Sequence, residues 1–117
     1  MISFNSYGEW TEISESDNGA ITYIDMDTIK RHEGYVYYWE LVNRHKPDKW
    51  EDMSFKVYKQ TDCDVNRYKF LTFVTYEQPM GKGSSETITP PDDWKWTYPP
   101  PGTIGGISLS YIFDIVD

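Results

Sequence analysis

The chain has 117 residues, a length that fits one domain with one hydrophobic core. Its 19 acidic and 11 basic residues give a net charge of -8, which argues against nucleic acid and anionic membrane surfaces as partners. The sequence contains no run of about 18 apolar residues, so no transmembrane segment is expected.

Aromatic residues make up 17% of the chain, with ten tyrosines and five tryptophans, whereas alanine occurs only at Ala20. Aromatic side chains favour β-strands, and the scarcity of alanine argues against a helical bundle. Charged residues are interleaved with apolar ones, a pattern typical of antiparallel strands with one solvated face. The composition therefore predicts a sheet whose core is built from large side chains.

The chain is predicted to begin with a β-hairpin. Strands are expected near residues 9–14 and 20–25, and the Asn-Gly pair in the turn at residues 16–19 is a strong hairpin signal. Residues 26–31 are then expected to form one helical turn, with Asp25 as its N-cap.

The clearest strand of the sequence spans residues 35–43. Side chains alternate between the two faces of a strand. One face would carry Tyr35, Tyr37, Trp39 and Leu41, and the other Val36, Tyr38, Glu40 and Val42. Because both faces are largely apolar, we expect this strand at the centre of the sheet.

Two further strands are predicted at residues 53–61 and 67–76. Strict alternation in the second places Tyr68, Phe70, Val74 and Tyr76 on one side and Arg67, Lys69, Leu71 and Phe73 on the other. A glycine-rich loop at residues 81–83 and a short edge strand at residues 85–89 are expected to follow.

Residues 90–102 hold five of the seven prolines, which exclude a central strand and predict an extended strap over the surface. Trp94, Trp96 and Tyr98 alternate within this strap, so an extended chain points them to the same side. They either cover the sheet edge as a satellite core or form a partly exposed binding surface for a protein or for sugar rings. These three are the candidate binding residues.

A C-terminal helix is predicted over residues 103–116, starting at Thr103 or Ser108. Its apolar stripe would contain Ile104, Ile107, Tyr111 and Ile115, widened by Leu109, Ile112 and Phe113. Such a stripe requires burial, most simply against the sheet. The predicted fold is α+β: a single antiparallel β-sheet of about five to six strands with a C-terminal α-helix packed on it.

Catalytic and metal-binding motifs are incomplete in this sequence. Asp25 and Asp27 begin like a calcium loop, but Lys30 stands where glycine is needed. The segment at residues 81–84 resembles part of a phosphate loop, but Lys82 is not followed by serine or threonine. We therefore predict a protein that is not an enzyme and has no cofactor.

The residues best suited to metal ligation or nucleophilic catalysis are also widely spaced. His32, His45 and Cys63 show no ligand spacing, so no metal site is expected. Cys63 lies between Asp62 and Asp64, whose charges work against a thiolate. A buried small hydrophobe is the simpler interpretation of this cysteine.

The order of these features resembles the surface-adhesin protein E family of bacterial secreted or outer-membrane proteins. The residues that carry the resemblance are Trp10, Tyr23-Ile24-Asp25, Thr28-Ile29-Lys30-Arg31, Val36-Tyr37-Tyr38-Trp39-Glu40-Leu41, Ser54, Asp62-Cys63, Arg67, Gly81-Lys82-Gly83, Trp94 and Pro100-Pro101-Gly102-Thr103. The resemblance runs from Trp10 to the end of the chain and implies a single domain over residues 1–117.

The resemblance also implies an extracytoplasmic location (periplasm, outer-membrane surface or secretion) from a lipoprotein or secreted precursor. The N-terminus lacks the basic and apolar regions of a signal peptide, so either the leader has been removed or the protein is cytosolic. Family members commonly pair the cysteine equivalent to Cys63 with one at the end of the helix. Residues 113–117 contain no cysteine, so either the bridge is absent or the chain stops short of it.

The resemblance further implies that the protein is a binding module, that it adheres to host matrix glycoproteins such as vitronectin or laminin, and that it forms a homodimer. The sequence leaves two alternative functions open. One is a small carbohydrate- or peptide-binding module that uses the strap, and the other is a structural envelope protein that self-associates.

Overall fold

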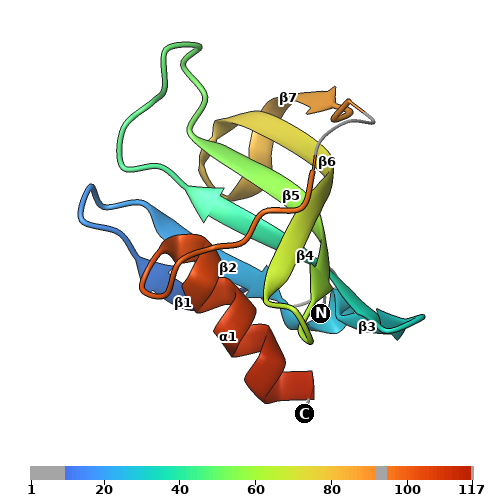
Figure 1. The fold of residues 1–117 in the computed structure, drawn as a ribbon. Helices are drawn as coiled ribbons and strands as arrows, with labels where there is room; N and C mark the ends of the chain where they lie inside the picture. The colour runs from blue at the N-terminus through green and yellow to red at the C-terminus, as the bar shows by residue number, and fades with distance from the viewer. Residues whose placement is uncertain (1–9, 92–94, 117) are drawn as a thin grey trace, which may run out of the picture.

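The structure, a computed structural model, describes residues 10–91 and 95–116 (Figure 1). These residues form one antiparallel sheet of seven strands and one C-terminal helix, which confirms the predicted α+β fold with one or two strands more than expected. The strands are β1 (Trp10–Glu15), β2 (Ile21–Asp25), β3 (Lys30–His32), β4 (Tyr35–Asn43), β5 (Ser54–Asp62), β6 (Arg67–Gln78) and β7 (Lys82–Ile88), with 3-10 turns η2 (Met26–Thr28) and η3 (Pro79–Gly81) and helix α1 (Ile104–Val116). The sheet order is β1-β2-β4-β5-β6-β7, and β3 pairs with β4 beside this path.

The N-terminal hairpin is confirmed, and the helical turn after it is confirmed in part. Asp25 caps η2 by accepting a hydrogen bond from the Asp27 amide at 3.1 Å. The prediction of helix through residue 31 is wrong, because Lys30–His32 is strand β3. Glu33 and Gly34 have φ angles of 51° and 86°, which suit a tight hairpin turn that folds β3 back on β4.

Strand β4 lies inside the sheet, as predicted, and its two faces have different environments. Val36 and Tyr38 point to the side covered by α1, where they form a buried cluster with Ile24 and Ile112. We call this side the helix face. The opposite side, which carries Tyr35, Tyr37 and Trp39, is called the open face.

For β6, the predicted assignment of side chains to the two faces of the sheet is correct up to Phe70 and wrong after it. Tyr58 pairs with Thr72 and Lys59 pairs with Phe70, so Leu71 is an extra residue that forms a β-bulge. Side chains after the bulge therefore change face. Phe73 and Thr75 follow Tyr68 and Phe70 on the helix face, whereas Val74 and Tyr76 join Arg67, Lys69 and Thr72 on the open face.

The edge strand after β6 starts earlier than predicted. Residues 79–81 form η3, and β7 already begins at Lys82, where Gln78 is its cross-strand partner. The expected loop at residues 81–83 is therefore mostly strand. Gly81 and Gly83 have φ angles of 67° and 80°, a conformation that glycine adopts without strain, which lets the chain turn within this short span.

Helix α1 begins at Ile104 and is capped by Thr103, one of the two predicted starts, whose hydroxyl accepts a hydrogen bond from the Gly106 amide at 3.2 Å. The predicted buried stripe is confirmed at Leu109 and Ile112, which are buried, and wrong at Ile107, Phe113 and Ile115, which are exposed. Gly106 and Ser108 are also buried. At the other end Arg31 of β3 donates a hydrogen bond to the Val116 carbonyl, which ties the helix C-terminus to the sheet.

Close packing at Gly106 explains which side of α1 is buried. A Cβ atom at this position would lie 2.5 Å from the Pro100 carbonyl oxygen, so only glycine allows the strap to pass so near the helix. We expect Gly106→Ala to lower the free energy of unfolding by about 1–3 kcal/mol through overpacking, although alanine by itself favours a helix.

The control is Ser110→Ala on the exposed side of the same helix, which should change stability little. Urea unfolding of both variants is the measurement. A Gly106→Ala variant that is more stable than the parent chain would contradict the close packing.

Candidate binding surface

The strap places two of the three candidate residues together. Thr97 pairs with Tyr68 in an antiparallel bridge, with backbone hydrogen bonds of 2.8 and 3.0 Å. Trp96 and Tyr98 flank Thr97 and therefore point to the opposite side from it, as the alternation predicts. Trp94 lies outside the described residues.

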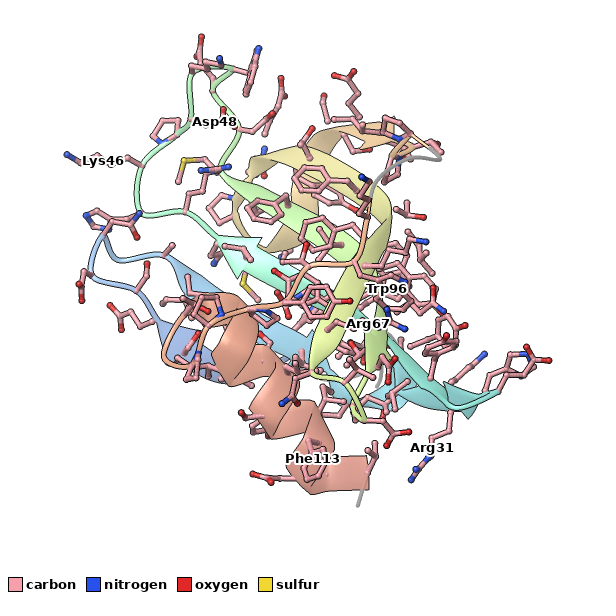
Figure 2. All side chains as sticks on the ribbon, viewed as in Figure 1. Arg31, Lys46, Asp48, Arg67, Trp96 and Phe113 are labelled. Atoms are coloured by element: carbon pink, nitrogen blue, oxygen red, sulfur yellow. The ribbon has the colours of Figure 1, made fainter. Side chains whose placement is uncertain are left out.

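Arg67 joins these two side chains to the sheet. Its guanidinium carbon lies 4.2 Å from the centre of the Trp96 ring, a cation–π distance. It donates one hydrogen bond to the Tyr98 hydroxyl at 3.3 Å and another to Asp62 at 3.0 Å. The Tyr98 hydrogen bond and then Asp62 raise the pKa of Arg67, so the guanidinium remains charged. Arg67 and Trp96 lie near each other at the right of Figure 2.

The strap residues continue into a row of aromatic side chains on the open face. Trp96 contacts Tyr35, with ring centres 5.6 Å apart. Farther along the face, the Tyr58 ring lies 6.2 Å from Tyr37 and 5.1 Å from Trp39. All five rings are half-buried, so each keeps some surface in contact with solvent. Trp96 is therefore part of a larger aromatic surface.

Two lysines border this aromatic surface. The cross-strand register places Lys30, Tyr37, Gln60 and Lys69 in one line across β3, β4, β5 and β6. Cross-strand partners share a face, so both lysines lie on the open face, with Tyr37 and Gln60 between them. Neither lysine forms an ion pair with any of the described residues. We call Lys30, Tyr35, Tyr37, Trp39, Tyr58, Gln60, Arg67, Lys69, Trp96 and Tyr98 together the aromatic–cationic surface.

The tyrosine at the centre of this surface is neutral at physiological pH. Burial raises the pKa of the Tyr37 hydroxyl above its usual value, and the charge of Glu33 raises it further. The hydroxyl therefore keeps its proton and can both donate and accept hydrogen bonds.

Most of this surface could not be predicted from local patterns. The alternation of residues 35–43 placed Tyr35, Tyr37 and Trp39 on one face, but no local pattern joined that face to the strap. The signal that was available is the two-sided apolar pattern of residues 35–43 in a chain with one helix, because one helix covers only one side of a sheet. Lys30 and Lys69 join the surface only through strand pairing.

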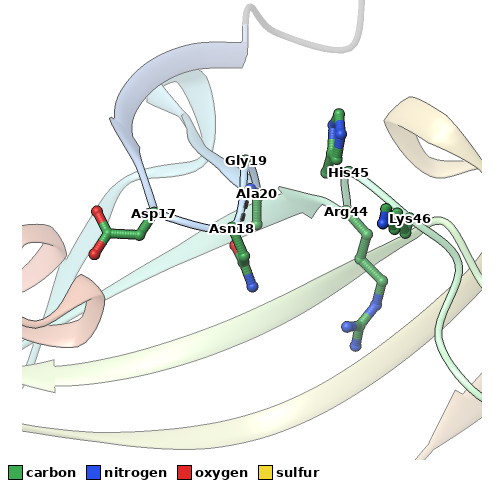
Figure 3. A pocket seen from close by; sticks show the side chains of 7 residues that line it. All are labelled: Asp17, Asn18, Gly19, Ala20, Arg44, His45 and Lys46. Carbon is green, nitrogen blue, oxygen red and sulfur yellow. Dashed lines mark hydrogen bonds between the residues drawn. The ribbon is translucent and has the colours of Figure 1, made fainter.

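A hollow of about 560 Å³ lies at one end of the sheet, between the β1–β2 turn and the end of β4 (Figure 3). Its lining mixes polar and apolar surface and consists of Asp17, Asn18, Gly19, Ala20, Arg44, His45 and Lys46. Asn18 accepts a hydrogen bond from the Ala20 amide at 3.1 Å, which serves the turn itself. This hollow has a structural explanation and shows no arrangement of nucleophile and base.

A second hollow, of about 480 Å³, is lined by four acidic side chains, Asp48, Asp52, Glu77 and Glu86, and by the basic side chain of Arg44. Phe73 and Thr75 also line it. These two side chains belong to the helix face, so the hollow lies on the other side of the sheet from Tyr37 and Lys69.

Within residues 10–91 and 95–116, no group of three or more histidine, cysteine, aspartate or glutamate side chains is placed to hold a metal ion. No helix in the same ranges has the length and apolar character needed to cross a membrane. Cys63 is half-buried and packs against the cluster that contains Tyr38 and Ile112.

The fold is similar to solved structures of Haemophilus influenzae protein E. With crystal form II of that protein the TM-score is 0.69 at 17% sequence identity, covering 95% of this chain and 91% of the other. With another protein E structure the TM-score is 0.66 at 16% identity, covering 95% and 88%. A comparison with curated protein sequences gives no match.

A family comparison extends this likeness from fold to sequence. The sequence profile described as surface-adhesin protein E matches residues 10–112, which include all seven strands, the strap and most of α1. The profile covers well over half of the chain and the fold agrees with protein E structures, so this chain belongs to the surface-adhesin protein E family.

Proposed function

We propose that the chain is a non-catalytic adhesion module that works outside the cytoplasm and binds a matrix glycoprotein of the vitronectin or laminin kind through its aromatic–cationic surface. Family membership supports a surface-adhesin role in general. The single observation that carries the choice of surface is the continuity of Trp96 and Tyr98 with the rings of Tyr35, Tyr37 and Tyr58.

The composition of this surface suits protein recognition. Tryptophan, tyrosine and arginine dominate the binding energy of protein interfaces, because they offer large and rather stiff contact area with a polar end. Tyr98 is 60% exposed and Trp96 is held in place by Arg67, so little side-chain freedom is lost when a partner binds.

Binding to immobilised vitronectin and laminin tests the proposal. We expect saturable binding, and Trp96→Ala should weaken it at least about tenfold, the effect of removing a central interface tryptophan. The matched control is Trp50→Ala in the β4–β5 loop. Trp50 is 70% exposed and lies outside the aromatic–cationic surface.

Two results would contradict the proposal. Equal weakening by both tryptophan variants would mean that this surface has no special role. Failure of the parent chain to bind either glycoprotein would refute these partners while family membership stands, and light scattering would then test self-association through the same surface.

A further inference from the structure

We propose that the aromatic–cationic surface recognises an acidic polysaccharide chain, with sugar rings stacked on its aromatic side chains and sulfate or carboxylate groups paired with Lys30 and Lys69. This inference rests on the proposed function, because it names the chemical part of a matrix glycoprotein that the open face contacts. The polysaccharide would lie across the centre of the open face and would not be limited to the strap.

The aromatic rings of the open face pack against one another in pairs. Ring centres are 6.2 Å apart for Tyr37 and Tyr58, 5.1 Å for Trp39 and Tyr58, and 5.6 Å for Tyr35 and Trp96, so neighbouring rings overlap in part. Each ring is half-buried and leaves part of its surface to solvent, against which the C–H groups of a sugar ring can pack. Gln60 shares this face and can bond to sugar hydroxyls.

The backbone of this surface is unsuitable for binding an extended peptide. Peptides that add to a sheet bind at an edge, where backbone N–H and C=O groups have no partners. Strands β4 and β5 are paired on both sides, so their backbone groups are already used within the sheet. A ligand on this face is therefore recognised by side chains alone.

Charge complementarity selects an acidic ligand. The chain as a whole is acidic, yet Lys30 and Lys69 lie at the two ends of one cross-strand line. Strands are about 4.8 Å apart, so three strand spacings separate these lysines by roughly 14 Å. Two cations at that separation, with Tyr37 and Gln60 between them, match a polymer that carries anions at intervals along a line of sugar rings.

The first experiment compares dextran sulfate with uncharged dextran, which has the same sugar backbone. We expect the intact chain to bind immobilised dextran sulfate but not dextran, with an affinity that falls as salt is raised. Polygalacturonate, which carries carboxylates, tests whether a carboxylate serves as well as a sulfate, and binding to either polyanion supports the inference. Polyglutamate, an acidic polymer without sugar rings, should bind much more weakly.

Matched variants locate the site. Lys30→Gln with Lys69→Gln should weaken dextran sulfate binding about fivefold or more, since two charge pairs are lost. Lys46→Gln with Lys82→Gln makes the same change in net charge at exposed positions away from the surface and should have little effect. Tyr37→Leu keeps an apolar side chain but removes the ring, so it should weaken binding without changing the salt dependence.

Several outcomes would overturn the inference. Equal weakening by the two lysine pairs would indicate non-specific charge attraction, and polyglutamate binding as tightly as dextran sulfate would indicate an acidic peptide ligand. Binding to vitronectin or laminin without binding to any polyanion would refute the inference and leave the proposed function intact. Binding to dextran sulfate without binding to either glycoprotein would support the inference and refute the proposed glycoprotein partners.

Discussion

Lys59→Met is expected to lower the free energy of unfolding by about 3–5 kcal/mol, because it leaves the Glu40 carboxylate buried without its partner. Lys59 and Glu40 are only 2% and 3% exposed. The lysine Nζ lies 3.1 and 3.0 Å from the two carboxylate oxygens. It also lies 4.4 Å from the centre of the Tyr68 ring and 5.8 Å from that of Phe70.

The double variant Glu40→Leu with Lys59→Met separates the cost of an unpaired charge from the value of the pair itself. Replacing both members of a buried pair by apolar residues of similar size is often neutral or stabilising. We therefore expect the double variant to recover most of the stability lost in Lys59→Met.

Urea unfolding followed by circular dichroism, with the slope of the transition compared between variants, measures both effects. A loss below about 1 kcal/mol in Lys59→Met would mean that water reaches Glu40, contrary to its burial here. A double variant as unstable as the single one would mean that the pair itself stabilises the fold.

Ile112→Ala should be the most damaging truncation in α1, with a loss of about 2–5 kcal/mol in the free energy of unfolding. Ile112 has no exposed surface, and it packs in one cluster with Ile24, Val36 and Tyr38 of the sheet. Removing its outer methyl groups leaves a cavity between helix and sheet, because strands β2 and β4 are held by their neighbours and cannot move in to fill it.

The matched control is Ile115→Ala, the same substitution one turn later in the same helix. Ile115 is 41% exposed, so its truncation should cost less than about 1 kcal/mol. Thermal and urea unfolding of both variants would show the difference. Similar losses for the two variants would mean that Ile115 is as well packed as Ile112, contrary to its exposure here.

Local sequence signals predicted most of the secondary structure correctly. The Asn-Gly turn, the Asp25 cap and the Thr103 cap each depend on groups within a few residues of one another. The alternation of residues 35–43 predicted a strand inside the sheet, and β4 has a neighbour on each side. Such features are readable because their physical cause is contained in one short segment.

The errors have a common origin in contacts between distant segments. The bulge at Leu71 changes the facing of Phe73 and Val74, and it is visible only in the pairing of β6 with β5. The buried side of α1 depends on the strap at Pro100, which approaches Gly106 too closely for any other residue. Neither effect can be predicted from the local pattern of apolar residues.

For this protein, the sequence by itself determined the α+β class, the central strand, the cap of the helix and the family, and it drew attention to Trp96 and Tyr98. Only the tertiary structure decided that these two side chains join Tyr35 and Tyr37 in one surface, and that Lys30 and Lys69 border it. The physical reason is that periodicity places a side chain on a face of its own strand, whereas register between strands decides which side chains become neighbours.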